Sequence, residues 1–250
     1  MFYGVPRNRF QDLNKALSIL ADIYEGRFYT NDMLITLSRN MSFQLDEKFM
    51  QIFESTASSD QEESLLWRLH TLCWAAQNAL HIEGDFVECG VLKAFCSEVI
   101  LKYIDFDKVN KQAYLYDTFA GLPEKTSTEE ERQKWNYSED DPDALYQSVC
   151  QKFSNMKNVH VVKGIVPDSF KEAVPEKIAF LHIDMNSVQA EILALEHLFD
   201  RVTPGGHIIF DDYGWRANIK QMFAERDFLL KRNHHVMELP TGQGLVIKHN

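Results

Sequence analysis

The sequence predicts a three-layer α/β fold: a doubly wound sheet, mostly parallel with an antiparallel C-terminal edge strand, plus a helical N-terminal extension. Three observations indicate this. Residues 10–80 carry apolar side chains at helical spacing. Beyond them, short apolar runs alternate with helical stretches, and the chain closes on two apolar runs joined by a turn. Strand–helix alternation produces right-handed crossovers, so helices should cover both faces of the sheet.

The N-terminal third shows helical spacing and no clear alternating strand. The stretch "NKALSILADIYE" (14–25) has this spacing, and "SDQEESLLWRLHTLCWAAQNAL" (59–80) has it more strongly. Ser59 or Asp60 is a suitable N-cap for the second helix. We therefore expect residues 1–80 to form a helical extension packed on the core, and residues 81–250 to form the main domain.

Five apolar runs in the main domain read as strands, and we expect a helix after each. They are "GDFVECG" (84–90), "AYLYDTF" (113–119), "VHVVKG" (159–164), "KIAFLHID" (177–184) and "GGHIIFDD" (205–212). The last stretch, "HVMELPTGQGLVIKH" (235–249), reads as two strands joined around Pro240–Gly244, which should add an antiparallel edge. Ligands of such open sheets bind beyond the carboxyl ends of the strands.

Composition excludes several function classes. The 250 residues carry a formal net charge of −11 and a pI of about 5.3, which argues against nucleic acid or anionic lipid as the main partner. The four cysteines form no CxxC pair, so we expect reduced thiols in the cytoplasm rather than a zinc site. The start of the sequence lacks the apolar core of a signal peptide, and no apolar run is long enough to span a membrane.

Acidic or glycine residues stand where the first three predicted strands end. Glu88 and Gly90 close the first, Asp117 the second and Gly164 the third. Gly90 would let the backbone turn tightly and a ligand approach closely. An acid at the end of the second strand can accept hydrogen bonds from both hydroxyls of a ribose, which favours an adenosine-type ligand. The alternatives are an ordinary strand-to-helix turn and a turn aspartate.

Three further acids end the fourth and fifth strands: Asp184, and the adjacent pair Asp211 and Asp212. Carboxylates that converge there would repel one another unless a cation compensates them. Mg²⁺ or another hard divalent cation prefers such oxygen ligands. The sequence therefore predicts a metal site, and the alternative is a solvated Asp184 with a helix-capping aspartate.

Several motifs together resemble the macrocin O-methyltransferase-like (TylF/MycF-type) family of class I S-adenosylmethionine-dependent methyltransferases. They are "GDFVECGVLKAF", "LYDTFAGLP", "FLHIDMN", "RVTPGGHIIFDDYGW" and "LPTGQGLVIK". The resemblance covers roughly residues 30–250. It implies the class I methyltransferase fold, with a seven-stranded sheet and a helical extension. It also implies Mg²⁺-dependent methyl transfer to a hydroxyl, commonly on a sugar of a natural product or a surface glycan.

The resemblance also assigns site residues. Glu88 and Gly90 match the methionine-side cofactor motif, Asp117 the ribose-binding acid, and Thr118 and Phe119 the residues that flank the adenosine; Gly164 joins this cofactor set. Asp184, Asp211 and Asp212 match the family's metal aspartates. One departure is visible: the family often reads D-x-D-x-Y after the fourth strand, whereas this chain has Asn186 and Val188 at the later positions. Both changes bear on the substrate and on the fine geometry of the metal.

The base that deprotonates the acceptor is open on the sequence. Asp212 is a candidate base, while Asp184 belongs to the predicted catalytic residues as a holder of the metal. His182 lies two residues before Asp184, so an extended strand aims both at one face, and it is a second candidate base. The alternative for His182 is a hydrogen-bonded histidine under the sheet. His207 is a weaker candidate of the same kind, and Gln243 from the last hairpin is a candidate to reach the site. A last candidate, Trp215, suits either a stacked sugar or the core.

The long acidic segment 120–143 suits either a lid over the substrate or a solvated, partly disordered insertion. Three function classes remain on the sequence. The first is a Mg²⁺-assisted O-methyltransferase for a small-molecule or glycan acceptor. The others are a metal-independent N- or C-methyltransferase on the same fold, and a non-catalytic homologue. Self-association through the helical N-terminus is a further expectation.

Overall fold

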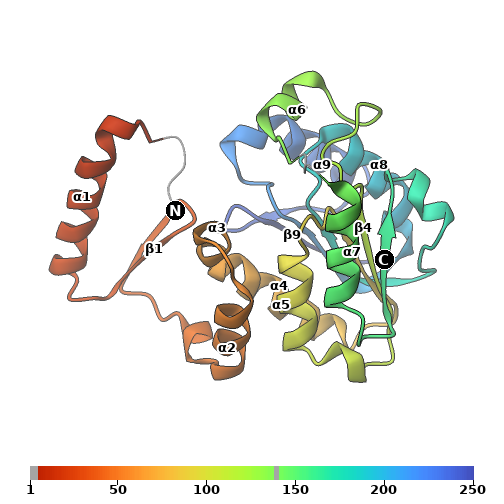
Figure 1. The fold of residues 1–250 in the computed structure, drawn as a ribbon, viewed down its shortest axis with the longest axis horizontal. Coiled ribbons are helices and arrows are strands. Elements are labelled where there is room, and N and C mark those ends of the chain that lie inside the picture. Colours follow the sequence, from red (N-terminus) through yellow and green to blue (C-terminus); the bar gives the residue numbers. More distant parts are fainter. Residues whose placement is uncertain (1–4, 138–140) are drawn as a thin grey trace. The chain divides into compact units, whose positions relative to one another are not determined.

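The computed structural model describes residues 5–137 and 141–250, and it divides the chain into two compact units, residues 1–70 and 71–250 (Figure 1). Helix α4 (Leu66–Ala79) crosses from the first unit into the second. The domain boundary predicted at residues 80 and 81 lies just beyond the end of this helix. That boundary, and the packing of the extension on the core, stay predictions.

The first unit contains helices and one hairpin. Its elements are η1 (Arg7–Arg9), α1 (Phe10–Ile23), β1 (Phe28–Asn31), β2 (Leu34–Leu37), η2 (Ser42–Leu45), α2 (Glu47–Thr56) and α3 (Asp60–Ser64). Helix α3 begins at the predicted N-cap, because the Ser59 side chain accepts a hydrogen bond from the backbone N–H of Glu62. The rings of Phe43, Phe49 and His70 pack against one another, with centroids 4.7 to 6.4 Å apart.

The expectation that the N-terminal region is purely helical is wrong, since β1 and β2 pair antiparallel from Phe28↔Leu37 to Asn31↔Leu34. The two turn residues, Asp32 and Met33, have φ of 46° and 61°. Positive φ at both central positions matches the twist of a two-residue hairpin. Glycine usually occupies the second position of such a turn, whereas this chain has methionine there. The buried Arg68 guanidinium holds the Asp32 carboxylate at 2.6 Å and so stabilises the turn.

The second unit is built on a seven-stranded sheet of order β5-β4-β3-β6-β7-β9-β8. Its strands are β3 (Asp85–Cys89), β4 (Ala113–Asp117), β5 (Val159–Lys163), β6 (Ile178–Ile183), β7 (Val202–Phe210), β8 (Met237–Glu238) and β9 (Gly244–Ile247). The first five strands pair parallel, whereas β9 pairs antiparallel with both β7 and β8. The predicted doubly wound sheet with its antiparallel edge is therefore confirmed.

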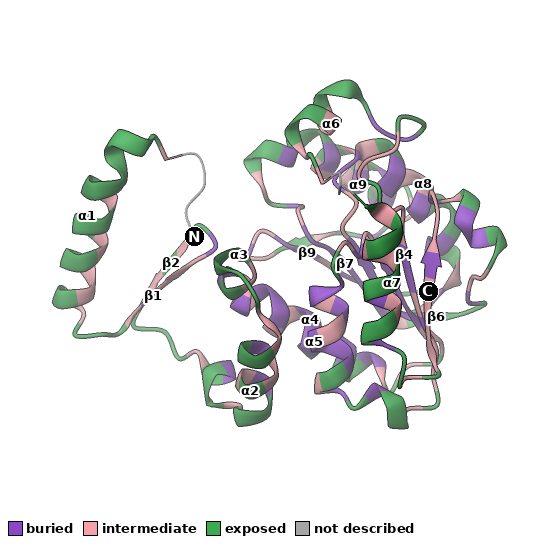
Figure 2. Cartoon of the chain, viewed as in Figure 1, coloured by how far each residue is buried: buried purple, intermediate pink, exposed green. Residues whose placement is uncertain are grey.

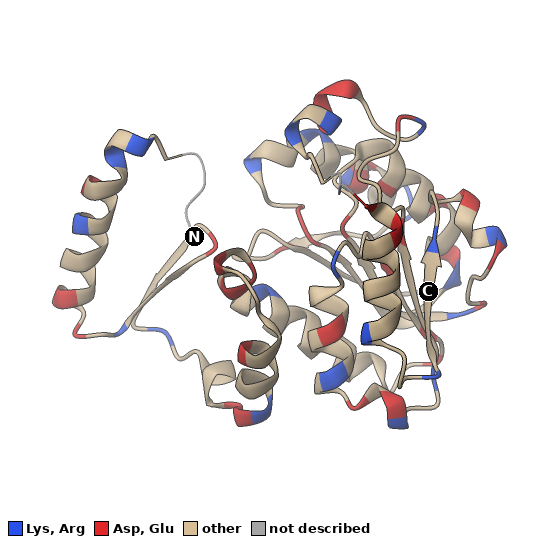
Figure 3. Cartoon of the chain, in the orientation of Figure 1, with Lys and Arg blue, Asp and Glu red and all other residues tan. Residues whose placement is uncertain are grey.

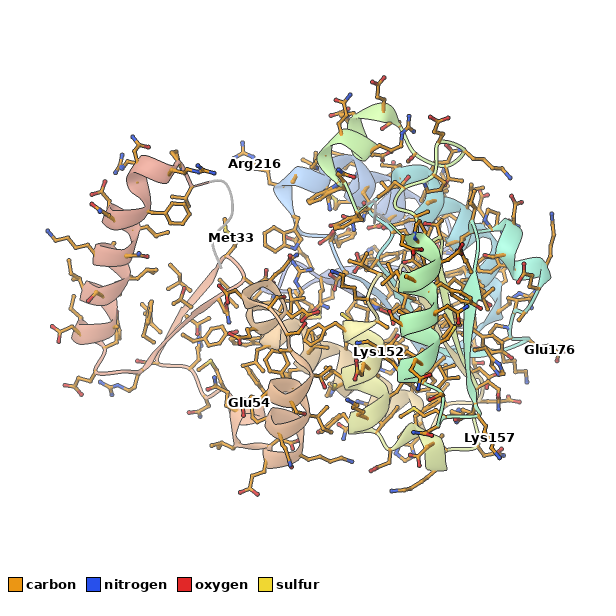
Figure 4. The ribbon with its side chains drawn as sticks, in the orientation of Figure 1. Met33, Glu54, Lys152, Lys157, Glu176 and Arg216 are labelled. Carbon is orange, nitrogen blue, oxygen red and sulfur yellow. The ribbon has the colours of Figure 1, made fainter. Side chains whose placement is uncertain are left out.

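Helices lie on both faces of this sheet (Figure 1). They are α5 (Phe95–Tyr103), α6 (Glu129–Lys134), α7 (Pro142–Lys152), α8 (Val188–Leu198) and α9 (Ile219–Leu230), with short 3₁₀ turns η3 (Phe106–Lys108), η4 (Asp168–Lys171), η5 (Phe199–Arg201) and η6 (Arg216–Asn218). Right-handed crossovers in opposite directions from β3 place α5 and α7 on one face, and α8 and α9 on the other. Lys152, labelled in Figure 4, pairs with Glu98 at 2.5 Å and joins α7 to α5.

One predicted helix is absent from the described chain. The segment between β5 and β6 contains only the 3₁₀ turn η4. Pro167 and Pro175 flank this turn, and proline interrupts a helix because it lacks the N–H donor and clashes with the preceding turn. Strand–helix alternation therefore holds for four of the five predicted units.

One apolar core lies between the sheet and the layer of α8 and α9. All six residues of β6 are buried (Figure 2). Alternate residues of the parallel strands, such as Leu181, Ile183 and Phe210, form one apolar cluster with Leu195 and Leu198 of α8. The intervening residues face the α5 layer, where polar side chains collect. In the part of the chain that the structure describes, no helix is long and apolar enough to cross a bilayer.

Candidate active site

The carboxyl ends of β3 and β6 are in direct contact. The Asp184 N–H donates to the Cys89 carbonyl at 2.8 Å, and Gly90 follows with φ of +91°. A Cβ at Gly90 would overlap the Asp184 carbonyl oxygen. Glycine is therefore required here by a close backbone approach and by a left-handed turn. This close contact joins Gly90, of the predicted cofactor motif, to Asp184, one of the predicted metal aspartates.

Asp117, at the end of β4, holds the turn that follows β3. Its Oδ2 accepts the backbone N–H of Val91 at 2.6 Å and of Leu92 at 2.7 Å, and its Oδ1 accepts that of Phe119 at 2.6 Å. Its carbonyl oxygen accepts the Gly164 N–H at 2.8 Å, which ties in the end of β5. Asp117 is thus a turn aspartate. A carboxylate has about four acceptor positions, so one is left for a ribose hydroxyl.

The other predicted cofactor residues shape the same edge. Thr118 Oγ1 donates to the Gly121 carbonyl at 2.7 Å. Phe119 has φ of +57° and is buried, with its ring 5.4 Å from that of Tyr146 on α7. A Cβ at Gly164 would lie 3.0 Å from that of Ser169. The structure brings these three residues to the carboxyl ends of β4 and β5. Their contact with a cofactor stays a prediction.

Asparagine at position 117 should loosen the turn, because one carboxylate oxygen becomes an amide that cannot accept the backbone N–H groups. We expect Asp117→Asn to destabilise the protein by about 1–3 kcal/mol and to weaken S-adenosylmethionine binding. Chemical denaturation and calorimetry measure the two effects. The same change at exposed Asp107 is the control, and equal effects of both variants would contradict the role of Asp117.

A buried polar network runs under the strand ends on the α5 face. Glu88 and His182 are register partners on β3 and β6, and Glu88 Oε1 lies 3.1 Å from His182 Nδ1. The Ser97 hydroxyl of α5 donates to the other oxygen of Glu88. His182 Nε2 lies 3.5 Å from Asp211 Oδ1. Three strands are thus joined by one imidazole that has no exposed surface.

The charges of this network are set by burial and pairing. Burial lowers the pKa of His182, but the nearby carboxylates of Asp211 and Glu88 outweigh burial and raise the pKa to about 10. Burial raises the pKa of Glu88, an effect that the contact with His182 opposes. The alternative interpretation of His182, a hydrogen-bonded histidine under the sheet, therefore fits the structure better than a general base.

The last hairpin reaches the site as predicted. The Gln243 amide donates to Asp211 Oδ1 at 3.0 Å, while the Thr241 hydroxyl donates to Gln243 Oε1 at 2.9 Å. The indole of Trp215 packs on Gly242, so this ring contacts the hairpin turn. His207 lies against Trp74, with ring centroids 5.4 Å apart, and burial lowers its pKa.

The three predicted metal aspartates end adjacent strands, since the Asp211 N–H donates to the Ile183 carbonyl at 3.0 Å. Asp184 and Asp212, like Asp211, each accept a hydrogen bond from a side-chain carboxamide: Asn186 Nδ2 lies 3.2 Å from Asp184 Oδ1, and Asn218 Nδ2 lies 3.0 Å from Asp212 Oδ2. Within residues 5–137 and 141–250, no three His, Cys, Asp or Glu side chains are grouped to hold a metal ion. The metal site therefore stays a prediction.

A buried glutamate pair lies on the opposite face of the sheet and was not predicted. Glu191 of α8 accepts the backbone N–H of Met185 at 3.0 Å and of Asn186 at 3.2 Å, which supports the turn after Asp184 from below. Burial raises the pKa of Glu191, and it raises that of neighbouring Glu225 of α9 to about 7. The sequence feature that could have identified Glu191 is its helical spacing with Leu195 and Leu198, which places an acid on the apolar face of the helix.

The described parts of the predicted lid, residues 120–137 and 141–143, are folded, and the second contains the start of α7. Helix α6 begins with a capping box between Thr128 and Glu131. Glu131 Oε1 also accepts the Val188 N–H at 2.9 Å, and the Ser187 hydroxyl donates to the Thr126 carbonyl. This segment is therefore docked on the start of α8, beside Asp184. Residues 138–140 lie outside the described residues, and closure over a substrate stays a prediction.

The chain is similar to proteins of one known family. The profile of the Macrocin-O-methyltransferase (TylF) family matches residues 66–239. Mycinamicin III 3''-O-methyltransferase of Micromonospora griseorubida is 28% identical over 162 residues, which are 58% of this chain and 62% of that protein. The 8-demethyl-8-(2,3-dimethoxy-alpha-L-rhamnosyl)-tetracenomycin-C 4'-O-methyltransferase of Streptomyces olivaceus is 26% identical over 161 residues, 59% of this chain and 60% of that protein. The matched part thus spans about three-fifths of the length of these curated relatives.

Solved structures show the same fold. The O-methyltransferase NovP has a TM-score of 0.63 at 15% identity, over 95% of this chain and 99% of NovP. The calicheamicin methyltransferase CalS11 has a TM-score of 0.58 at 15% identity, over 83% of this chain and 93% of CalS11. The family profile takes in β3 to β7 with every predicted cofactor and metal residue, and it matches more than half of the sequence. The chain therefore belongs to the macrocin-O-methyltransferase (TylF) family.

Proposed function

We propose that this protein is an S-adenosylmethionine-dependent O-methyltransferase that acts on a hydroxyl of a sugar, in a natural product or a surface glycan. The observation that carries the proposal is the row of acids at the ends of β3, β4, β6 and β7, inside the segment that matches the family. The two curated relatives are named O-methyltransferases, and the name of the second contains a rhamnosyl group.

The β3–α5 turn and the end of β4 fit the cofactor. Gly90 keeps the turn narrow, and Asp117 fixes its backbone while it retains one acceptor position for a ribose hydroxyl. When bound, S-adenosylmethionine supplies a methyl group on a sulfonium that is open to in-line displacement. The chain's own residues align the acceptor oxygen and accept its proton.

Asp212 is the proposed general base. It is partly exposed beyond β7, whereas His182 is fully buried and so cannot touch an acceptor. The Asn218 carboxamide fixes one carboxylate oxygen of Asp212 and so restricts its direction. Asp184 of the neighbouring strand completes the acidic edge on which the acceptor hydroxyl would lie.

Mg²⁺ assistance is a further part of the proposal, with Asp184, Asp211 and Asp212 as the residues that would hold the ion. Its support is the donor set: three carboxylates at two adjacent strand ends, each oriented by a carboxamide, as metal-binding carboxylates commonly are. When bound, a divalent ion lowers the pKa of a coordinated hydroxyl and fixes its oxygen.

Calorimetry with S-adenosylmethionine, followed by assays on a panel of glycoside acceptors with and without EDTA, tests the function. We expect cofactor binding, and methyl transfer that stops with EDTA and returns with Mg²⁺. Absence of cofactor binding would leave a non-catalytic homologue. Full turnover in EDTA would indicate a metal-independent methyltransferase, and transfer to nitrogen or carbon acceptors alone would contradict the proposed chemistry.

Three other predictions accompany this function: a cytoplasmic location, self-association, and an acceptor that is not a nucleic acid. The acidic composition supports the last of them. Size-exclusion chromatography with light scattering measures the subunit number, and a single-subunit mass would contradict self-association.

A further inference from the structure

One turn after β6 carries Asp184, and one after β7 carries Asp211 and Asp212. Helix α6 contacts residues that follow each of these turns. Through Glu131 it accepts the N–H of Val188, the first residue of α8. Through Lys134, in its last turn, it reaches Asn218 at the start of α9. Acidic residues lie in its first turn and basic residues in its last (Figure 3).

The contact at the second anchor is a short relay. Lys134 Nζ donates to Asn218 Oδ1 at 3.0 Å and also to the carbonyl of Ala217. Asn218 is buried, and its Nδ2 donates to Asp212 Oδ2 at 3.0 Å. The proposed base is thus joined to α6 by one side-chain carboxamide.

The Lys134 ammonium and the Asp212 carboxylate together determine the orientation of the Asn218 carboxamide. A lysine ammonium has only donors, so it requires the oxygen of Asn218. A carboxylate has only acceptors, so Asp212 requires the amide nitrogen. Without the lysine, the Asn218 amide loses the partner that holds its oxygen away from Asp212 and gains rotational freedom. The direction of the Asp212 carboxylate then becomes less well defined.

We propose that Lys134 is a positioning residue, which sets the direction of Asp212 through the Asn218 carboxamide. The inference rests on the proposed function for its kinetic consequence, because Asp212 is the proposed base. It gives the segment 120–137 a role besides covering a substrate, since its docking would complete the acidic site.

The chain offers a matched control on the same two helices. Lys220 of α9 pairs with Glu130 of α6 at 2.8 Å, and both side chains are about three-quarters exposed. This lysine also joins α6 to α9, but it pairs with Glu130 rather than with Asn218 or Asp212. A general loss of α6 docking would affect Lys134 and Lys220 variants alike, whereas a positioning role singles out Lys134.

The experiment compares Lys134→Met, Lys134→Arg and Lys220→Met in the full chain. We expect Lys134→Met to lower kcat about 10- to 100-fold, as the loss of a partner that orients a site residue commonly does, with KM for the cofactor unchanged. Lys134→Arg should restore part of the loss, and Lys220→Met should stay within about twofold. Asn218→Asp, which keeps an oxygen for Lys134 but removes the donor to Asp212, should match Lys134→Met.

A double variant and hydrogen exchange complete the test. Lys134→Met combined with Asn218→Asp should lose no more kcat than either change alone, because both break one relay. Amides of the turn from Asp212 to Asn218 should exchange faster in Lys134→Met than in Lys220→Met. Equal kcat and equal exchange in the two lysine variants would overturn the inference. An inactive wild type would contradict the proposed function instead, and the exchange comparison would still decide whether Lys134 holds the turn.

Discussion

Replacement of Gly90 with alanine is expected to destabilise the protein by more than about 3 kcal/mol, and to abolish cofactor binding. The new Cβ would overlap the carbonyl oxygen of Asp184, which is backbone and cannot turn aside. The residue also has φ of +91°, a conformation that disfavours any side chain. Relief of the clash must separate the ends of β3 and β6, where the proposed cofactor and acceptor meet.

Gly205 supplies the control for this variant. Its φ of +90° is nearly the same, but a Cβ there would meet only the terminal methyl of Ile82, at 3.1 Å. Gly205→Ala therefore measures the conformational cost alone, about 1–2 kcal/mol. Chemical denaturation compares the two variants. If Gly90→Ala were no less stable than Gly205→Ala, the contact between the two strand ends would not be a constraint on the fold.

Glu225→Gln is expected to stabilise the protein at pH 8, by an amount on the order of 3 kcal/mol. Burial raises the pKa of Glu225 to about 7 in the folded state, against an ordinary value of 4.5. The folded protein therefore keeps a proton that the unfolded chain has lost between these values. Stability falls as pH rises from about 4.5 to about 7 and then stays low. Glutamine remains neutral and removes this fall.

Denaturation at pH 5 and pH 8 checks this sign. The wild type should lose stability between the two pH values, and Glu225→Gln should lose much less of it. Glu196→Gln makes the same charge change on the exposed side of α8 and should follow the wild type. A Glu225→Gln variant with the pH dependence of the wild type would show that Glu225 does not keep its proton in the folded protein.

Most strands of the sheet could be predicted, because each is identified by a short stretch of neighbouring residues. Five apolar runs ending in Gly or acid identified five parallel strands, and the Pro240–Gly244 turn identified the antiparallel pair. The two wrong predictions concern segments whose residues differ from those that usually indicate the structure. Asp32 and Met33 form a hairpin turn without glycine, and buried Arg68, far along the chain, stabilises it. Pro167 and Pro175 exclude the helix that alternation alone predicted between β5 and β6.

The sequence predicted the positions of the site residues at the strand ends better than it predicted which residues they contact. The acids do stand at the strand ends, and Gln243 does reach Asp211. The three backbone bonds of Asp117 and the links of Glu191 to Met185 and Asn186 join residues through tertiary packing, which spacing in the sequence does not encode. The relay from Lys134 to Asp212 likewise spans a loop and two helices.

The strand order has a consequence for how the protein is made. β9 is the last strand in the chain, yet it lies between β7 and β8 and is preceded by Gln243, the amide partner of Asp211. Ribosomal synthesis proceeds from the N-terminus, so the other six strands emerge before this partner exists. The nascent chain accordingly lacks the Gln243 partner of Asp211 until the β8–β9 hairpin is released, and the proposed activity should appear only after translation has passed β9.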